Sequence, residues 1–182
     1  ATAMGTQCEL NDWEKRTMGF VDFFKDFIKI VKEENLPLDF FSYHSYAQPE
    51  FTLIMQQFVE RTLIANGLDN TEIHLNEWNT NPTLKDKGTL KACSNALAMM
   101  CTMQYTKMNV MCYYDGAISV NPYGGLFSPL TYEPFPVYYG FDYILGIGST
   151  FCVYVVCFRC DGLVVHFRSV AVDVESDGRI VR

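Results

Sequence analysis

The sequence lacks any cluster of lysine and arginine residues. Its 182 residues include 14 Lys and Arg against 21 Asp and Glu, which gives a net charge of −7 and an isoelectric point of about 4.9. An acidic chain without a basic patch is unsuited to nucleic acid or to an anionic membrane surface, because both carry negative charge. We expect neither as a partner, whereas neutral ligands such as sugars remain open.

Two other absences exclude further classes of protein. No glycine-rich phosphate loop follows a predicted strand, which argues against nucleotide binding. The longest apolar run, residues 144–158, is shorter than the roughly 20 residues of a transmembrane helix, and it contains Gly, Ser and Thr. Its Val and Phe content favours strands. We therefore expect no membrane span.

The cysteines form no recognisable metal or disulfide pattern. There are seven of them, an odd number, and Cys157 and Cys160 have the C-x-x-C spacing. A single such pair is weak support for a zinc or redox site. Buried thiols in a reducing compartment are the simpler interpretation, which favours a cytoplasmic location. We expect no metal and no organic cofactor.

The apolar content predicts a folded chain of alternating helices and strands. Apolar residues make up 49% of the sequence and aromatic residues 15%, enough for one domain with a sizeable core. Helices are expected over residues 11–35, 51–67, 89–107 and 135–143, and strands over residues 38–43, 72–77 and 109–114. The strands begin about 35 residues apart, which is typical of successive right-handed βα units. Both a (β/α)8 barrel and an open doubly wound sheet fit this order.

The spacing of apolar residues also predicts which helix faces are buried. On the first helix the expected face consists of Phe20, Phe23, Phe24, Phe27, Ile28 and Val31, and on the second of Phe51, Ile54, Met55, Phe58 and Val59. Asn11 and Glu14 are the expected capping box of the first helix. Gly67 is the expected C-terminal stop of the second.

Polar residues follow the predicted strands where each of them ends. His44 and Tyr46 follow the first strand, Glu77 ends the second, and Tyr114 and Asp115 end the third. Since the carboxyl ends of parallel strands meet at one edge of a sheet, we expect these side chains to converge. A carboxylate in such a cluster suits a site that binds a polar, ring-shaped substrate and attacks it.

Five motifs occur in order along the chain. They are residues 38–46 (LDFFSYHSY), 76–79 (NEWN), 113–115 (YYD), 125–134 (GLFSPLTYEP) and 138–141 (YYGF). Together they resemble glycoside hydrolase family 39, the β-xylosidases and related enzymes. The Glu-Trp-Asn triplet also resembles a sister family of arabinofuranosidases, whereas the GLFSPLT run followed by Tyr-Tyr is more specific.

The resemblance covers residues 1–143 and implies part of a (β/α)8 barrel, about strands 6–8 with helices 5–8. It implies that Glu77 is the nucleophile, and that the general acid/base is a Glu after an Asn on a fourth strand outside this chain. Reading Asn76 and Glu77 as that acid/base pair does not fit the elements that follow. Residues 144–182 do not match and are expected to be a separate β-rich tail, such as truncation or a frameshift would produce.

The implied chemistry is that of a retaining glycosidase, in which one carboxylate attacks the sugar and a second carboxyl group protonates the leaving oxygen. We expect His44 and Tyr46 to keep Glu77 ionised by hydrogen bonds. We expect Trp78 and Tyr114 to offer apolar surface to a sugar ring. The full set expected to bind a xyloside or related glycoside is His44, Tyr46, Asn76, Trp78, Asn79, Tyr114 and Asp115.

Several of these residues have plainer alternatives. Tyr46 and Trp78 are as compatible with packing as with a site, and Asp115 can simply cap a turn. His74 is expected to point away from the partners of Glu77 and to be structural. The whole chain also has an alternative, a catalytically incomplete barrel fragment that acts at most as a carbohydrate-binding or interaction module. Unpaired sheet edges in such a fragment predict self-association.

Overall fold

The computed structural model describes residues 13–80, 82–123, 125–146 and 152–156, and eight elements alternate along them. The order is α1 (Trp13–Glu33), β1 (Phe40–Ser45), α2 (Pro49–Ala65), β2 (Glu72–Trp78), α3 (Leu90–Met103), β3 (Met108–Tyr114), α4 (Pro136–Gly146) and β4 (Cys152–Val156). The predicted alternation is confirmed. The largest shifts are in β1, which begins and ends two residues later than expected, and in α3, which stops at Met103.

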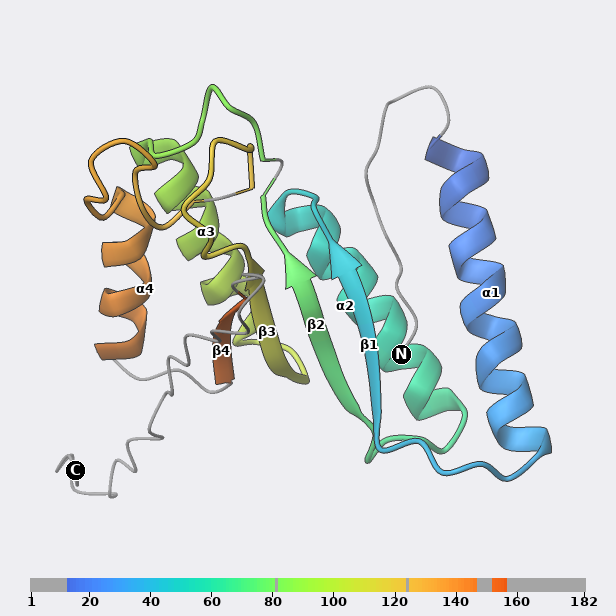
Figure 1. The fold of residues 1–182 in the computed structure, drawn as a ribbon. Coiled ribbons are helices and arrows are strands. Elements are labelled where there is room, and N and C mark those ends of the chain that lie inside the picture. Colours follow the sequence, from blue (N-terminus) through green and yellow to red (C-terminus); the bar gives the residue numbers. More distant parts are fainter. Residues whose placement is uncertain (1–12, 81, 124, 147–151, 157–182) are drawn as a thin grey trace, which may run out of the picture.

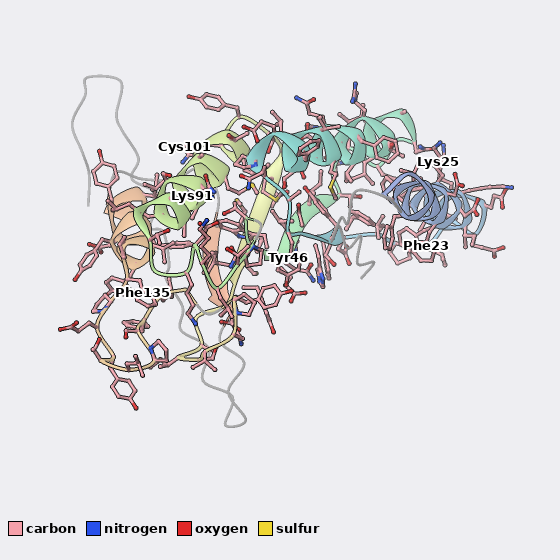
Figure 2. The ribbon with its side chains drawn as sticks, turned by 90° about the horizontal axis from the view of Figure 1, so that it is seen from above. Phe23, Lys25, Tyr46, Lys91, Cys101 and Phe135 are labelled. Carbon is pink, nitrogen blue, oxygen red and sulfur yellow. The ribbon has the colours of Figure 1, made fainter. Side chains whose placement is uncertain are left out.

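The strands form one parallel sheet in the order β1-β2-β3-β4, so each strand lies beside its neighbour in sequence (Figure 1). A doubly wound sheet reverses its strand order and carries helices on both faces. This sheet shows no reversal along the described strands, and its helices lie on one side (Figure 2). The fold is therefore α/β with a barrel-like partial sheet, although the described strands do not close into a complete barrel.

A single core lies between the sheet and the four helices. Alternate strand residues face it, including Phe41, Ile73 and Met111, each no more than 2% exposed. All four helices contribute buried residues to the same cluster, namely Phe24 and Ile28 of α1, Val59 and Leu63 of α2, Ala96, Met99, Met100 and Met103 of α3, and Val137, Phe141 and Ile144 of α4. Burying apolar faces on one side leaves the other face of the sheet free of helices and available for polar groups.

Two of the predicted helix faces need correction. Phe23 of α1 is 54% exposed, and on α2 Phe51 and Ile54 are 52% and 60% exposed. The buried face of α2 instead includes Thr52 and Gln56. These polar residues are buried because the sheet supplies hydrogen bonds: the Tyr43 hydroxyl donates to Gln56 Oε1 (2.8 Å), and Ser45 Oγ pairs with Thr52 Oγ1 (2.7 Å). Hydropathy alone does not reveal such partners.

Helix ends follow local capping rules. Gly67 has φ of +72°, a left-handed conformation that favours glycine, directly after α2 and its C-cap Asn66. The expected stop is thus confirmed. At the start of α3 the Thr89 side chain accepts a hydrogen bond from the Ala92 N–H (3.3 Å). The expected capping box at Asn11 lies outside the described residues.

Strand β4 lies in the segment 144–182 that we expected to be a separate tail. It pairs in parallel with β3 from Val110 opposite Cys152 to Tyr114 opposite Val156, so the sheet continues beyond residue 143. The domain boundary itself stays a prediction. Across the described ranges, no helix is long and apolar enough to cross a membrane.

Candidate active site

An irregularity in β2 decides which side of the sheet Glu77 faces. Leu75 is buried toward the helices opposite Tyr43, so strict alternation would send Glu77 the same way. The next residue of β1, His44, lies opposite Glu77 rather than Asn76. Asn76 is therefore an extra residue, a β-bulge, and it brings Glu77 to the helix-free face beside His44.

The same bulge turns Trp78 into the core. Trp78 is 0% exposed and packs edge-on against Tyr113, with ring centres 5.1 Å apart, and against Phe141 at 6.2 Å. The expectation that Trp78 offers its face to a sugar ring is therefore wrong. Asn76 was also expected to bind substrate; its Oδ1 is buried without a hydrogen-bond partner among the described residues.

Both oxygens of the Glu77 carboxylate accept a short hydrogen bond. The Tyr46 hydroxyl donates to Oε1 and His44 Nδ1 donates to Oε2, each at 2.6 Å. An ionised carboxylate only accepts, so Nδ1 of His44 carries the proton. The expected hydrogen bonds to Glu77 are thus present. The side chains of His44 and Glu77 keep 27% and 23% of their surface exposed, so a ligand can reach the pair.

The environment of Tyr46 keeps its hydroxyl protonated. Partial burial, and then the hydrogen bond to Glu77, raise the pKa of Tyr46 well above its usual range. The phenol therefore stays a donor to the carboxylate at any pH in ordinary use. Burial also raises the pKa of the neighbouring Tyr114, and the negative charges of Asp115 and Glu77 raise it further.

A third tyrosine, which the sequence did not single out, joins Tyr46 and Tyr114. Tyr123 lies edge-to-face with both, at centroid distances of 5.2 Å and 5.5 Å, and the other two rings are 6.3 Å apart (Tyr46 is labelled in Figure 2). All three side chains are partly exposed. In the sequence Tyr123 lies in a stretch rich in turn residues, and the aromatic ring within that stretch was the only available signal.

Two of the expected substrate-binding residues instead hold the loop after β3. Asn79, only 7% exposed, donates through Nδ2 to the carbonyls of Tyr114 (2.8 Å) and Tyr123 (3.3 Å). Asp115 is 3% exposed, and its Oδ1 accepts from the Ala117 N–H (3.1 Å), the turn-capping alternative. Burial raises the pKa of Asp115. Both side chains therefore hold the backbone of the loop that carries Tyr123.

His74 also differs from expectation. It lies opposite Ser42 and on the same helix-free face as Glu77, because the bulge returns Glu77 to that face. The expectation that it points the other way is wrong. Its own partners are separate, since its Nε2 lies 2.8 Å from Glu72 Oε2 and its ring stacks on Phe40 at 4.7 Å.

Residues that could bind a metal form no cluster in the described part of the chain. Within it, no group of three or more His, Cys, Asp or Glu residues could hold a metal ion. Cys93, Cys101 and Cys112 are free thiols, and burial raises the pKa of Cys112 to about 11. The C-x-x-C pair at residues 157–160 lies outside the described residues.

Comparison with known proteins gives only weak structural similarity. No protein-family model matches the chain, and no curated protein matches it. Among solved structures, the chain is similar to a glycoside hydrolase family 39 β-xylosidase from Caulobacter crescentus, with a TM-score of 0.46 and 12% sequence identity. The match covers 69% of this chain and 30% of that enzyme. A likeness of this extent assigns no residue a role, so function must come from the geometry of the site.

Proposed function

We propose that Glu77 is the nucleophile of a retaining glycosidase that acts on β-xylosides or related glycosides. One observation carries the proposal: both oxygens of this partly exposed carboxylate accept 2.6 Å hydrogen bonds, from His44 and Tyr46, at the carboxyl edge of a parallel sheet. Hydrogen bonds to the charged form keep a carboxylate ionised. An ionised, oriented carboxylate is what a retaining glycosidase needs on the sugar face opposite the leaving group.

The reaction assigned to Glu77 is the first half of a double displacement. One carboxylate oxygen forms a bond to the anomeric carbon, while the bond from that carbon to the leaving oxygen breaks and its electron pair stays on the leaving oxygen. His44 and Tyr46 fix the carboxylate plane, so the attacking oxygen is already aimed. Water later attacks the glycosyl ester and releases the sugar with its original anomeric configuration.

Natural glycosides also require a proton donor for the leaving oxygen. Asp115 interacts electrostatically with Glu77, but it is 3% exposed and bonded within its own loop. This observation favours a second candidate function, a module that binds sugar without cleaving unactivated glycosides. A substrate whose leaving group needs no proton therefore tests the nucleophile without requiring a general acid.

The test is covalent trapping with 2,4-dinitrophenyl 2-deoxy-2-fluoro-β-D-xyloside. Its leaving group departs without protonation, and the fluorine slows hydrolysis of the glycosyl ester, so the intermediate accumulates. We expect a stoichiometric burst of dinitrophenolate and a fluoroxylosyl mass increase on the peptide that contains Glu77.

Two variants control this experiment. Glu77→Gln should remain unlabelled, whereas Glu72→Gln should label like the wild type, because Glu72 lies on the same strand and is 57% exposed in its own pair with His74. Label on another residue, or none on the wild-type chain, would refute the nucleophile role. Sugar binding without label would favour the binding module.

A further inference from the structure

The loop between β3 and α4 carries Tyr123 to the edge of the proposed site. Its ring meets those of Tyr46 and Tyr114 edge-to-face at 5.2 Å and 5.5 Å. Tyr46 in turn donates its hydroxyl to Glu77. We infer that Tyr123 forms a wall of the sugar-binding site, and that Lys87 is the residue that positions it; the identity of the ligand as a sugar rests on the proposed function.

Tyr123 is suited to this task by its surroundings. The rings of Tyr46, Tyr114 and Tyr123 are each partly exposed, and their centres lie 5.2 to 6.3 Å apart. The hydroxyl of Tyr46 joins this group of rings to the Glu77 carboxylate. Binding sites for small molecules combine apolar aromatic surface with a few fixed polar groups. A pyranose has the matching character, since its C–H groups gather on one face and its hydroxyls lie at the edge. Tyrosine serves both parts, with an apolar ring and a polar tip.

The backbone around Tyr123 is hydrogen-bonded to Asp115, the residue that follows β3, and to Asn79. The carbonyl of Tyr123 accepts hydrogen bonds from the Asp115 N–H (3.3 Å) and from Asn79 Nδ2 (3.3 Å). The Gly125 N–H donates to the Asp115 carbonyl (3.3 Å). A Cβ at Gly125 would overlap the Tyr113 hydroxyl, so this close approach of the loop favours glycine.

Lys87, which precedes α3, reaches across to this loop. Its Nζ donates to the carbonyls of Ser119 and Asn121, the latter at 2.9 Å. The side chain of Asn121 then accepts from the Tyr123 N–H at 2.9 Å. Burial lowers the pKa of Lys87, and the nearby Asp115 carboxylate opposes that change. One ammonium group thus fixes two carbonyls of the loop just before it presents Tyr123.

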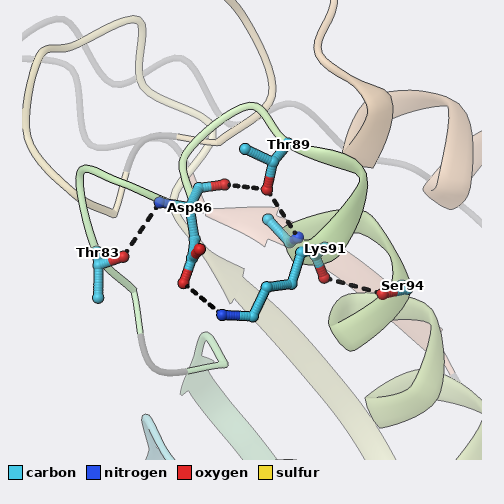
Figure 3. A network of polar contacts seen from close by, with 6 residues as sticks. Thr83, Asp86, Thr89, Lys91 and Ser94 are labelled. Atoms are coloured by element: carbon cyan, nitrogen blue, oxygen red, sulfur yellow. Dashed lines mark hydrogen bonds and ion pairs between the residues drawn. The ribbon is translucent and has the colours of Figure 1, made fainter.

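Lys87 differs from its neighbour Lys91, which provides a matched control. Lys91 Nζ pairs with Asp86 Oδ2 at 3.0 Å on the surface, and its side chain is 66% exposed. Figure 3 shows this ion pair beside the contacts of Thr83 and Thr89 at the start of α3. Lys91 thus stabilises the turn before α3, whereas Lys87 binds the tyrosine-bearing loop.

The test measures binding of methyl β-D-xylopyranoside to the full chain by saturation-transfer NMR, which needs no reaction at Glu77. We expect Tyr123→Ala to weaken binding by about five- to tenfold, the loss of one aromatic contact. Tyr123→Phe should retain most of the affinity. Tyr105→Ala is the matched control, because Tyr105 is 93% exposed beyond the end of α3. Thermal unfolding of each variant checks that it is folded.

The same measurement tests Lys87. Lys87→Met should weaken binding by about threefold, Lys87→Arg should restore it because a guanidinium also donates to two carbonyls, and Lys91→Met should have no effect. Unchanged affinity in Tyr123→Ala, an equal loss in Tyr105→Ala, or no binding by the wild type would overturn the wall role of Tyr123. Unchanged affinity in Lys87→Met would overturn its positioning role. Trapping at Glu77 has its own readout, so failure of either inference is distinguishable from failure of the proposed nucleophile.

Discussion

Two histidine–glutamate pairs lie on the same helix-free face of the sheet, yet their surroundings differ. His44 and Glu77 meet at 2.6 Å, and His74 and Glu72 at 2.8 Å. Glu77 has a second donor in Tyr46 and keeps 23% of its side chain exposed, whereas Glu72 is 57% exposed. A short His–carboxylate contact alone therefore does not distinguish the two pairs, whereas the additional donor and the lower exposure of Glu77 do.

Position along the strand accounts for this difference. Glu77 lies at the carboxyl end of β2, where the segments after β1, β2 and β3 supply Tyr46, Asn79 and Tyr123. Glu72 begins β2 at the opposite edge. In barrel-like parallel sheets the loops at the carboxyl edge carry the chemistry, and those at the amino edge contribute to stability. Substitutions in matched pairs test whether the two carboxylates divide in this way.

The largest contrast should come from the carboxylates. Glu77→Gln removes the attacking oxygen, so we expect release of dinitrophenolate from 2,4-dinitrophenyl β-D-xyloside to fall by about a thousandfold or more. Glu72→Gln should leave the rate within about twofold. The measurement is the initial rate of absorbance increase from dinitrophenolate at saturating substrate. Equal losses in the two variants would erase the distinction between the pairs.

A smaller contrast is expected from the histidines. His44→Asn shortens the donor to Glu77 and loses a charge-assisted hydrogen bond, so the trapping rate should fall by about ten- to a hundredfold. His74→Asn should label at the wild-type rate, because His74 pairs with Glu72, whereas the hydrogen bonds to Glu77 come from His44 and Tyr46. If trapping is slower in His74→Asn than in His44→Asn, the reactive site lies at the edge of the sheet that carries Glu72, and the proposed placement at Glu77 is wrong.

Tyr46→Phe makes the first pair resemble the second, because it removes the extra donor and keeps the ring against Tyr123. We expect trapping at Glu77 to slow by about tenfold, the value of a hydrogen bond to a charged group. Affinity for methyl β-D-xylopyranoside should change by less than about twofold, since the aromatic surface remains. A loss of affinity with an unchanged trapping rate would assign Tyr46 to binding instead.

The sequence predicted the order of elements well, because helical spacing and strand ends are local signals. Gly67 and the positions of His44 and Glu77 at strand ends belong to this part. The bulge at Asn76 was not foreseeable, since it exists only in the pairing of β2 with its neighbours. It reversed the expectations for both Trp78 and His74, because a one-residue shift exchanges the faces of a strand.

Side chains that depend on distant partners were equally hidden. Gln56 is buried through Tyr43, while the apolar Ile54 is 60% exposed, and neither fact follows from the sequence of α2 alone. Tyr123 lies 77 residues after Tyr46 in the numbering, and only the folded loop brings their rings to 5.2 Å. Local patterns therefore predicted where polar side chains converge, and tertiary contacts decided which residues lie in that cluster.

The smallest expected effect concerns what the second pair does. The His74 ring stacks on Phe40 with an interplanar angle of 8°, and Glu72 holds the imidazole at its edge. If this pair serves stability, His74→Ala should lower the free energy of unfolding by about 0.5–1.5 kcal/mol. Glu72→Gln should lower it by less than about 1 kcal/mol, because the Glu72 side chain is 57% exposed. Urea unfolding measures both, and neither variant should alter trapping at Glu77. Wild-type stability in His74→Ala would remove the structural role, because stacking on Phe40 is the contact that this substitution deletes.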